Sequence, residues 1–251
     1  EFIYARARTI VTATGSLART LGEQGIPEGK VFTIPNGANT ERFAPAPRDP
    51  EIRARYSIPE DAFLLCYVGL LGRLHGAGVI VEAAERLRDT PGVHFLIIGE
   101  GADRASMEAR AKRVGLANVT FGRSIPAADV PRVLNACDAG VATLKAVPLS
   151  RGALPVKVFE MMACALPVAF AGWGECADIL KAERAGIVVP CEDAGALADA
   201  VRALASDAPA AVEMGKKGRA FVEARYDRRK LADAYADILE KIILEETGAA
   251  S

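Results

Sequence analysis

The chain has 251 residues, which is enough for one or two domains and for a sizeable hydrophobic core. Its residues are 51% hydrophobic and 25% charged, and 31 Lys and Arg against 32 Asp and Glu leave a net charge of −1. This balance excludes a basic nucleic-acid coat and a disordered acidic tail. We therefore expect a globular protein with no nucleic acid among its partners.

The longest stretch without a charged residue, 161–174, is shorter than the ~20 apolar residues of a membrane-spanning helix. Five scattered cysteines form no CxxC pair, which is typical of a reducing cytoplasm. Two histidines and no acidic cluster at ligand spacing predict no metal site. The chain begins with Glu1 and carries no secretion signal, so it resembles a piece of a longer protein.

Short apolar runs alternate with helical patterns along the chain, which is typical of βα units that build a parallel sheet. Predicted strands cover residues 9–12, 31–34, 64–68, 94–98, 119–121, 139–142, 168–170 and 187–189. Predicted helices cover 79–87 and 104–114, and three more at 194–205, 210–224 and 228–243 follow the last strand. Because most strands are continuously apolar, both faces of the sheet should be covered. The predicted fold is α/β, a Rossmann-like, doubly wound parallel sheet with a helical C-terminal tail.

A proline-dense stretch, APAPRDP at residues 44–50, has no periodicity and predicts a stiff linker. It divides the chain into a leading βαβ piece with its linker, residues 1–47, and a larger domain, residues 48–251. The leading piece is too small to be stable alone.

A glycine-rich turn follows the predicted strand 64–68 and contains Gly69, Gly72, Arg73 and His75. Glycines let backbone N–H groups approach an anion, while the next helix and Arg73 supply positive potential. The turn matches neither GxxxxGK[ST] nor GxGxxG. It predicts a phosphate cradle, and the alternative is an ordinary βα turn with a solvated arginine.

A second turn, Gly99-Glu100-Gly101, follows strand 94–98, and Asp103 is a candidate N-cap for the next helix. A lone G-x-G is a weak pattern. Ligands of open parallel sheets bind where strands end, however, so two such turns on consecutive strands should line one crevice.

Lys157 and Glu160 lie three residues apart on a predicted helix that has Pro155 in its first turn, so they share one face. A cation for phosphate and a carboxylate for a sugar diol are what recognition of a nucleotide-sugar requires. The alternative is a surface ion pair. Apolar neighbours on both sides favour a position at the edge of the core, where charges usually have a task.

The order of segments resembles the GT-B glycosyltransferases of family 4. The resemblance rests on IPNGANTERF (34–43), YVG (67–69), IGEG (98–101), NVTFG (118–122), the helix of Lys157 and Glu160 with ACALPV (163–168), and AGIVVP (185–190). It covers nearly the whole chain. The GRLHG turn and the LPVKVFE helix are most similar to bacterial envelope-polysaccharide transferases of the N-acetylfucosamine and colanic-acid types.

This resemblance implies retaining transfer of a sugar from a nucleotide-sugar, often a UDP-sugar, in polysaccharide biosynthesis, with no cofactor and no required metal. It assigns the donor diphosphate to Gly69, Gly72, Arg73, His75 and Lys157. It assigns the ribose to Glu160 and the base to Gly99, Glu100, Gly101, Phe121, Gly122 and Ile125.

Two departures from the family limit what it implies. Many members carry a glutamate eight residues before the residue that corresponds to Glu160, whereas this chain has Gly152 there. Ser150 and Gly152 are therefore the candidate contacts to the donor sugar. No catalytic residue is assigned. The leading piece resembles only the end of the acceptor domain. The chain alone should therefore bind donor without transferring it, and its partner is an upstream acceptor domain or a separate subunit. The last helix, 228–243, would cross back toward that acceptor half.

We expect the full protein to lie in the cytoplasm. Its association with the inner face of the membrane is left open, and so is self-association. UDP and GDP donors are also both left open. The rival functions are a non-catalytic nucleotide-sugar-binding module and a dehydrogenase. The dehydrogenase is disfavoured because no acidic residue follows a GxGxxG at the required distance.

Overall fold

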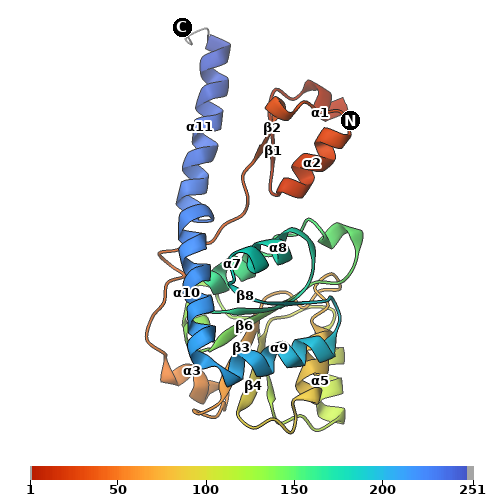
Figure 1. The fold of residues 1–251 in the computed structure, drawn as a ribbon, viewed down its shortest axis with the longest axis vertical. Coiled ribbons are helices and arrows are strands. Elements are labelled where there is room, and N and C mark those ends of the chain that lie inside the picture. The colour runs from red at the N-terminus through yellow and green to blue at the C-terminus, as the bar shows by residue number, and fades with distance from the viewer. Residues whose placement is uncertain (1, 248–251) are drawn as a thin grey trace.

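The main body of the computed structural model, which describes residues 2–247, is a six-stranded parallel sheet (Figure 1). Its strands follow the order β5-β4-β3-β6-β7-β8. They are β3 (Phe63–Val68), β4 (Val93–Ile98), β5 (Val119–Gly122), β6 (Ala139–Thr143), β7 (Val168–Ala171) and β8 (Gly186–Val189). The order reverses between β3 and β6, so the predicted doubly wound sheet is confirmed, and its switch point lies beside the end of β3.

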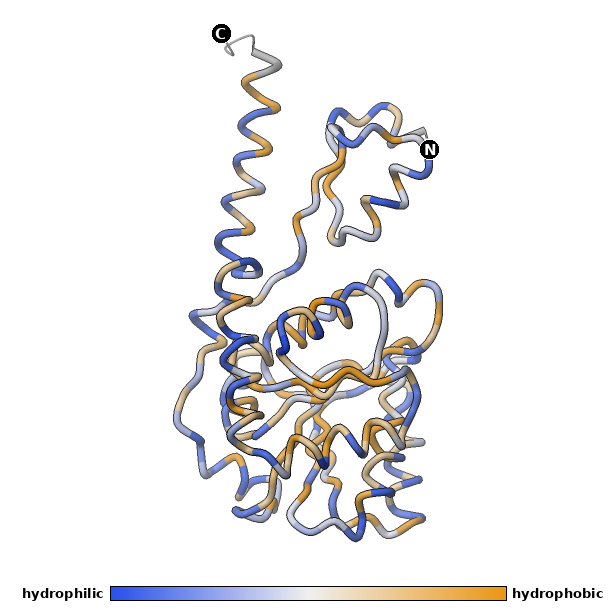
Figure 2. Tube along the Cα trace, viewed as in Figure 1, coloured by the Kyte–Doolittle hydropathy of each residue, from blue (hydrophilic) through white to orange (hydrophobic). Residues whose placement is uncertain are grey.

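Helices cover both faces of this sheet, as the apolar strands require. One face packs against α4 (Gly78–Arg86), α5 (Arg104–Arg113) and α9 (Ala194–Ser206). The other packs against α6 (Val130–Asn135), α7 (Val156–Ala163) and α8 (Gly174–Ala182). Side chains of β3 alternate between these two cores, with Leu64 and Cys66 in one and Leu65 and Tyr67 in the other. Figure 2 shows these strands as the hydrophobic centre of the body.

The remaining elements of the main body are short, apart from α10 (Ala208–Arg225), which packs against α7 and α9. They are α3 (Pro50–Arg55) and the 3-10 turns η2 (Ala127–Asp129) and η3 (Pro148–Ser150). The helix of Lys157 begins one residue later than Pro155. Asp103 stands at the N-cap of α5, but it makes no side-chain cap there. Its backbone is already helical, whereas a capping side chain needs an extended one.

The leading piece forms a separate two-stranded parallel sheet, β1 (Ile10–Thr12) with β2 (Val31–Thr33). Between the strands lie α2 (Gly15–Glu23) and the 3-10 turn η1 (Glu28–Lys30), and α1 (Phe2–Arg6) precedes them. The predicted βαβ unit is therefore present. In Figure 1 it lies apart from the large sheet, beside the upper half of the last helix.

The last helix, α11 (Arg228–Thr247), starts beside the linker and runs back to the leading piece. Asp227 caps it by accepting the backbone N–H of Arg229, at 3.0 Å, and it also accepts the Thr40 hydroxyl. Near its far end a cavity of about 120 Å³ separates helix residues from the leading piece. Its lining includes Thr9, Phe32, Ile238 and Ile242. The helix thus reaches the leading piece, whose origin in an acceptor half stays a prediction.

A carboxylate of the main body caps helix α2 of the leading piece. Glu175, in the first turn of α8, accepts the backbone N–H groups of Gly15 at 3.0 Å and Ser16 at 2.9 Å, and the Ser16 hydroxyl at 2.8 Å. Burial alone would raise the pKa of Glu175, but these hydrogen bonds and Arg19 hold it below its usual value. A carboxylate at the N-terminus of α2 is favoured because unpaired amides and the helix dipole converge there.

Two further observations concern the whole of the described chain. Across residues 2–247, no helix is both long and apolar enough to cross a bilayer. The five cysteines are free thiols, and four of them are buried.

Candidate functional site

The two predicted glycine turns meet where β3 and β4 end. The strand pairing continues into them, because Gly69 donates its N–H to Ile98 at 2.9 Å and Leu71 donates to Glu100 at 2.8 Å. A Cβ on Gly99 would lie 1.8 Å from the carbonyl oxygen of Gly69, and the φ of Gly99 is +149°. Only glycine tolerates both that contact and that backbone. The turns therefore form one surface at the switch point of the sheet.

Lys157 extends over this surface from α7. Its Nζ donates to the Tyr67 hydroxyl at 2.7 Å and lies 3.9 Å from the centre of that ring. The same Nζ would be 2.9 Å from a Cβ on Gly69, so it sits directly on the first turn. Burial lowers the pKa of Lys157 to about 8, and Glu160 opposes part of that effect. Among the residues that the structure describes, no acidic group lies within ion-pair distance of this amine.

His75 belongs to the same group of side chains. Burial and the nearby Lys157 charge hold the pKa of His75 below its usual value, so the ring is neutral at pH 7. Its Nδ1 is buried, has no hydrogen-bond partner among the described residues, and lies 3.4 Å from the Cβ position of Gly72. Arg73, between them in the chain, is exposed, and no described residue pairs with its side chain. Of the residues predicted for the diphosphate, Gly69, Gly72, His75 and Lys157 come together, while Arg73 projects from the same turn.

Glu160 lies one turn further along α7 and is half-buried. Burial raises the pKa of this carboxyl, against the nearby charges of Arg228, Arg42 and Lys157. Its carboxylate makes no hydrogen bond or ion pair with any residue in the described part of the chain. Lys157 and Glu160 therefore do not form the ion pair of the alternative interpretation, because the Lys157 amine is turned toward Tyr67. Both oxygens of Glu160 are available to accept hydroxyl groups.

The residues predicted for the base are held together by a residue that the sequence analysis missed. Arg104 donates from Nη1 to the carbonyl oxygens of Gly99 and Gly122, both at 2.6 Å. Its guanidinium lies 6.0 Å from the centre of the Phe121 ring and pairs with Glu108 at 2.7 Å. In the sequence it is only the first charged residue of a helix, and nothing local marks its reach to β5. It acts by fixing the turns after β4 and β5 relative to each other.

Three other residues predicted for the base site differ in exposure and in what they contact. Glu100 is exposed, Gly101 packs against the Leu71 carbonyl, and Ile125 packs against the core on the α7 face. A Cβ on Gly122 would meet Tyr56 at 2.9 Å.

The two predicted donor-sugar residues lie in the loop before α7. The Ser150 hydroxyl accepts the Trp173 indole N–H at 2.7 Å and donates within its own loop, to the carbonyl of Lys145 at 2.5 Å or of Val147 at 2.9 Å. The hydroxyl of Ser150 thus holds the loop together, and its contact with a sugar stays a prediction.

Gly152 instead borders a crevice of about 680 Å³ between this loop and α2. A Cβ there would lie 3.0 Å from the Cβ of Ser16, so the absence of a side chain lets α2 approach. Other residues that line the crevice are Thr14, Leu17, Arg19, Thr20, Glu23, Pro148, Leu149, Arg151 and Ala153. A sugar contact through Gly152 also stays a prediction.

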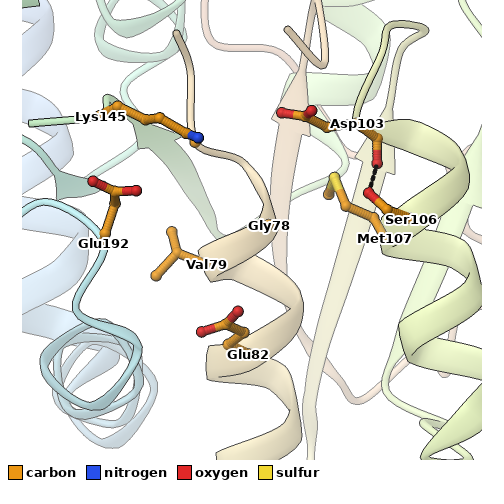
Figure 3. A pocket seen from close by; sticks show the side chains of 9 residues that line it. Gly78, Val79, Glu82, Asp103, Ser106, Met107, Lys145 and Glu192 are labelled. Atoms are coloured by element: carbon orange, nitrogen blue, oxygen red, sulfur yellow. Dashed lines mark hydrogen bonds between the residues drawn. The ribbon is translucent and has the colours of Figure 1, made fainter. Parts of the chain in front are cut away.

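A second cavity, of about 320 Å³, opens beside the starts of α4 and α5 (Figure 3). Figure 3 shows Lys145 and Glu192 on one side of it, Asp103 on the other and Glu82 below. Three carboxylates against one ammonium group disfavour an anion. None of the residues predicted to bind phosphate lines this cavity. An acidic cavity is also a poor place for a phosphate group, so its charges give no reason to move the predicted diphosphate site. The residues described by the structure also contain no group of three or more His, Cys, Asp or Glu side chains that could hold a metal ion.

Comparison with known proteins identifies the family. Residues 48–221 match the family model of the glycosyl transferases group 1. The chain belongs to this family. The predicted resemblance is thereby confirmed, and the family favours the glycosyltransferase over the dehydrogenase alternative.

The relatives and the structural neighbour named below are longer than this group 1 glycosyl transferase chain. It is 29% identical to the GDP-mannose-dependent alpha-(1-6)-phosphatidylinositol monomannoside mannosyltransferase of Mycobacterium tuberculosis, over 92% of the chain and 61% of the relative. It is 32% identical to the putative colanic acid biosynthesis glycosyl transferase WcaI of Escherichia coli, over 45% of the chain and 28% of the relative. The crystal structure of Anabaena Alr3699/HepE in complex with UDP has a TM-score of 0.80 at 17% identity, covering 93% of this chain and 64% of that one. The chain spans 57 to 61% of the first three curated relatives it matches.

The interlocked glycines of this group 1 glycosyl transferase predict a contrast between two substitutions. Gly99→Ala should destabilise the fold by about 3 kcal/mol or more, because the new methyl meets the Gly69 backbone. Gly92→Ala is the matched control, since Gly92 also has a positive φ, +74°, but open space around its Cβ position. It should cost only about 1 kcal/mol. Urea unfolding of both variants measures the difference, and equal losses would contradict the close approach of the two turns.

Proposed function

We propose that this chain is the donor-binding part of a retaining glycosyltransferase that takes its sugar from a UDP-sugar. The observation that carries the proposal is the Lys157 ammonium group, which lies half-buried on the Gly69 turn with no acidic partner among the described residues. An uncompensated buried charge is costly, and an anionic ligand removes that cost. The donor diphosphate is the anion that this position fits.

The surroundings of Lys157 support the same ligand. Arg73 extends from the adjoining turn with no described partner, and α4 begins just beyond with no side-chain cap. The positive end of the α4 helix dipole adds to the potential from Arg73 and Lys157. Fixed donors and cations of this kind stabilise charge that develops on a departing diphosphate. They supply that stabilisation without a metal, so we propose that the reaction requires neither a metal ion nor another cofactor.

The nucleoside is proposed to lie beside the diphosphate, over the ends of β4 and β5. Glu160 accepts the two ribose hydroxyls, since its carboxylate is half-buried and has no described partner. The turns that Arg104 fixes, with Phe121, form the base site. The UDP complex of the Anabaena protein supports uridine, whereas the Mycobacterium tuberculosis relative is named for GDP-mannose. UDP, GDP and ADP therefore belong in one binding panel.

Transfer itself is proposed for the full protein. The leading piece supplies one βαβ unit beside the crevice at Gly152, and the rest of an acceptor half would complete that crevice. The chain alone then binds donor, and a glycan or lipid-linked acceptor is bound by an upstream domain or a partner subunit. We place the full protein in the cytoplasm, and association with the inner face of the membrane is left open. A non-catalytic binding module is the alternative, and transfer by the full-length protein would exclude it.

Calorimetric titration with UDP tests the diphosphate assignment. The wild-type chain should bind UDP, while Lys157→Ala and Arg73→Ala should each weaken binding by about 1 to 3 kcal/mol because a charged contact is lost. Lys217→Ala removes an exposed lysine from α10 and should leave the affinity unchanged. Unchanged affinity in both site variants would remove the phosphate assignment.

A second titration separates the ribose contact from the diphosphate contact. Glu160→Gln should weaken UDP binding roughly fivefold or more, because a charged acceptor of two hydroxyl groups becomes a neutral amide. Inorganic diphosphate has no ribose, so its competition with UDP should remain largely unchanged relative to the wild type. Equal losses for both ligands would mean that Glu160 has a structural role.

A further inference from the structure

Tyr67 is an unusual residue in its strand. It is the next-to-last residue of the otherwise apolar strand β3, is fully buried, and belongs to the core on the α4 and α5 face of the sheet. Lys157 comes from α7, whose buried residues belong to the core on the opposite face. The contact between them therefore joins the two layers around the end of β3, where the glycine turn begins.

The hydroxyl of Tyr67 has two partners with fixed roles. It accepts a hydrogen bond from Lys157 Nζ at 2.7 Å and donates its only proton to the carbonyl oxygen of Leu70 at 2.8 Å. Leu70 lies inside the turn that contains Gly69 and Gly72. One chain of hydrogen bonds thus runs from the amine to the turn and sets the position of both.

We propose that Tyr67 is the positioning residue of the diphosphate site, holding the Lys157 amine on the glycine turn with a neutral hydroxyl that leaves the positive charge uncancelled. This inference rests on the proposed function. A carboxylate in the place of Tyr67 would fix the amine equally well, but it would neutralise the charge that a diphosphate must meet. The ring face adds attraction for the cation without adding a counter-charge.

The other charged and titratable groups near this pair act on it more weakly. Glu160 on α7 favours the charged form of Lys157, and His75 beside it is neutral. Asp103, at the start of α5, acts on Tyr67 and His75. Burial raises the pKa of Tyr67, so the phenol keeps its proton through the range in which Lys157 titrates.

The test is the pH dependence of UDP binding by Tyr67→Phe, which keeps the ring and removes the hydroxyl. Wild-type affinity should fall above about pH 8, where Lys157 loses its proton. Without its acceptor the charged amine is less favoured, so the fall should begin about half to one pH unit lower. At pH 8 this loss of the charged form should raise the dissociation constant about two- to fivefold.

Tyr226→Phe is the matched control. Tyr226 stacks on Phe159, with ring centres 4.3 Å apart, and it makes no contact with Lys157 that the structure records. Its loss of a hydroxyl should change neither the affinity nor the pH profile. A Tyr67→Phe profile that also coincides with the wild type would overturn the proposal.

A ligand-free measurement separates this inference from the proposed function. The side-chain amine of Lys157 is titrated by NMR, with its resonance assigned through Lys157→Arg, in the wild type and in Tyr67→Phe. A lower midpoint in Tyr67→Phe supports the positioning role even if UDP fails to bind, a failure that would count against the proposed function alone. If Tyr67→Phe does not fold, the titration of the wild-type chain decides. A Lys157 midpoint near 8 supports an amine that is fixed against Tyr67, and a midpoint near the ordinary 10.5 overturns the proposal.

Discussion

The site depends on a half-buried lysine ammonium group that has no acidic partner among the residues that the structure describes. Lowering the pKa of Lys157 from 10.5 to about 8 corresponds to a free energy on the order of 3 kcal/mol that opposes folding below pH 8 and fades as pH rises toward 10.5. A carboxylate neighbour would remove much of that cost. The chain instead offers a neutral phenol, so the free protein retains a charge that an anionic ligand can satisfy.

The fold supplies this position through ordinary features of a doubly wound sheet. The strand order reverses beside β3, which opens the carboxyl edge to a ligand. Glycines at positions 69, 99 and 101 let the turns after β3 and β4 pass at backbone contact. Helix α7 then brings Lys157 and Glu160 to the same edge, three residues apart. Arg104 fixes the neighbouring turn after β5, so cation, carboxylate and backbone donors share one rigid platform.

The sequence predicted the elements better than their long-range partners. Apolar strands and glycine turns reveal a parallel sheet locally, and the helical tail followed from alanine-rich periodicity in the last third of the chain. The roles of Tyr67 and Arg104 could not be predicted, because one looks like part of a buried strand and the other like a solvated helix start. Glu175 binds α2 across 159 residues of sequence, and only the folded chain brings them together. The prediction that Asp103 caps α5 with its side chain was wrong, because the backbone of Asp103 is itself helical.

Proton uptake on UDP binding tests the account most directly. Calorimetry at pH 8 in two buffers of different ionisation enthalpy measures it, since the UDP phosphates, with a pKa of about 6, are already ionised there. Half-protonated Lys157 should become fully protonated beside the diphosphate, so about half a proton should be taken up per UDP, and none in Lys157→Arg. Identical heats in both buffers for the wild-type chain would contradict a diphosphate held by this lysine.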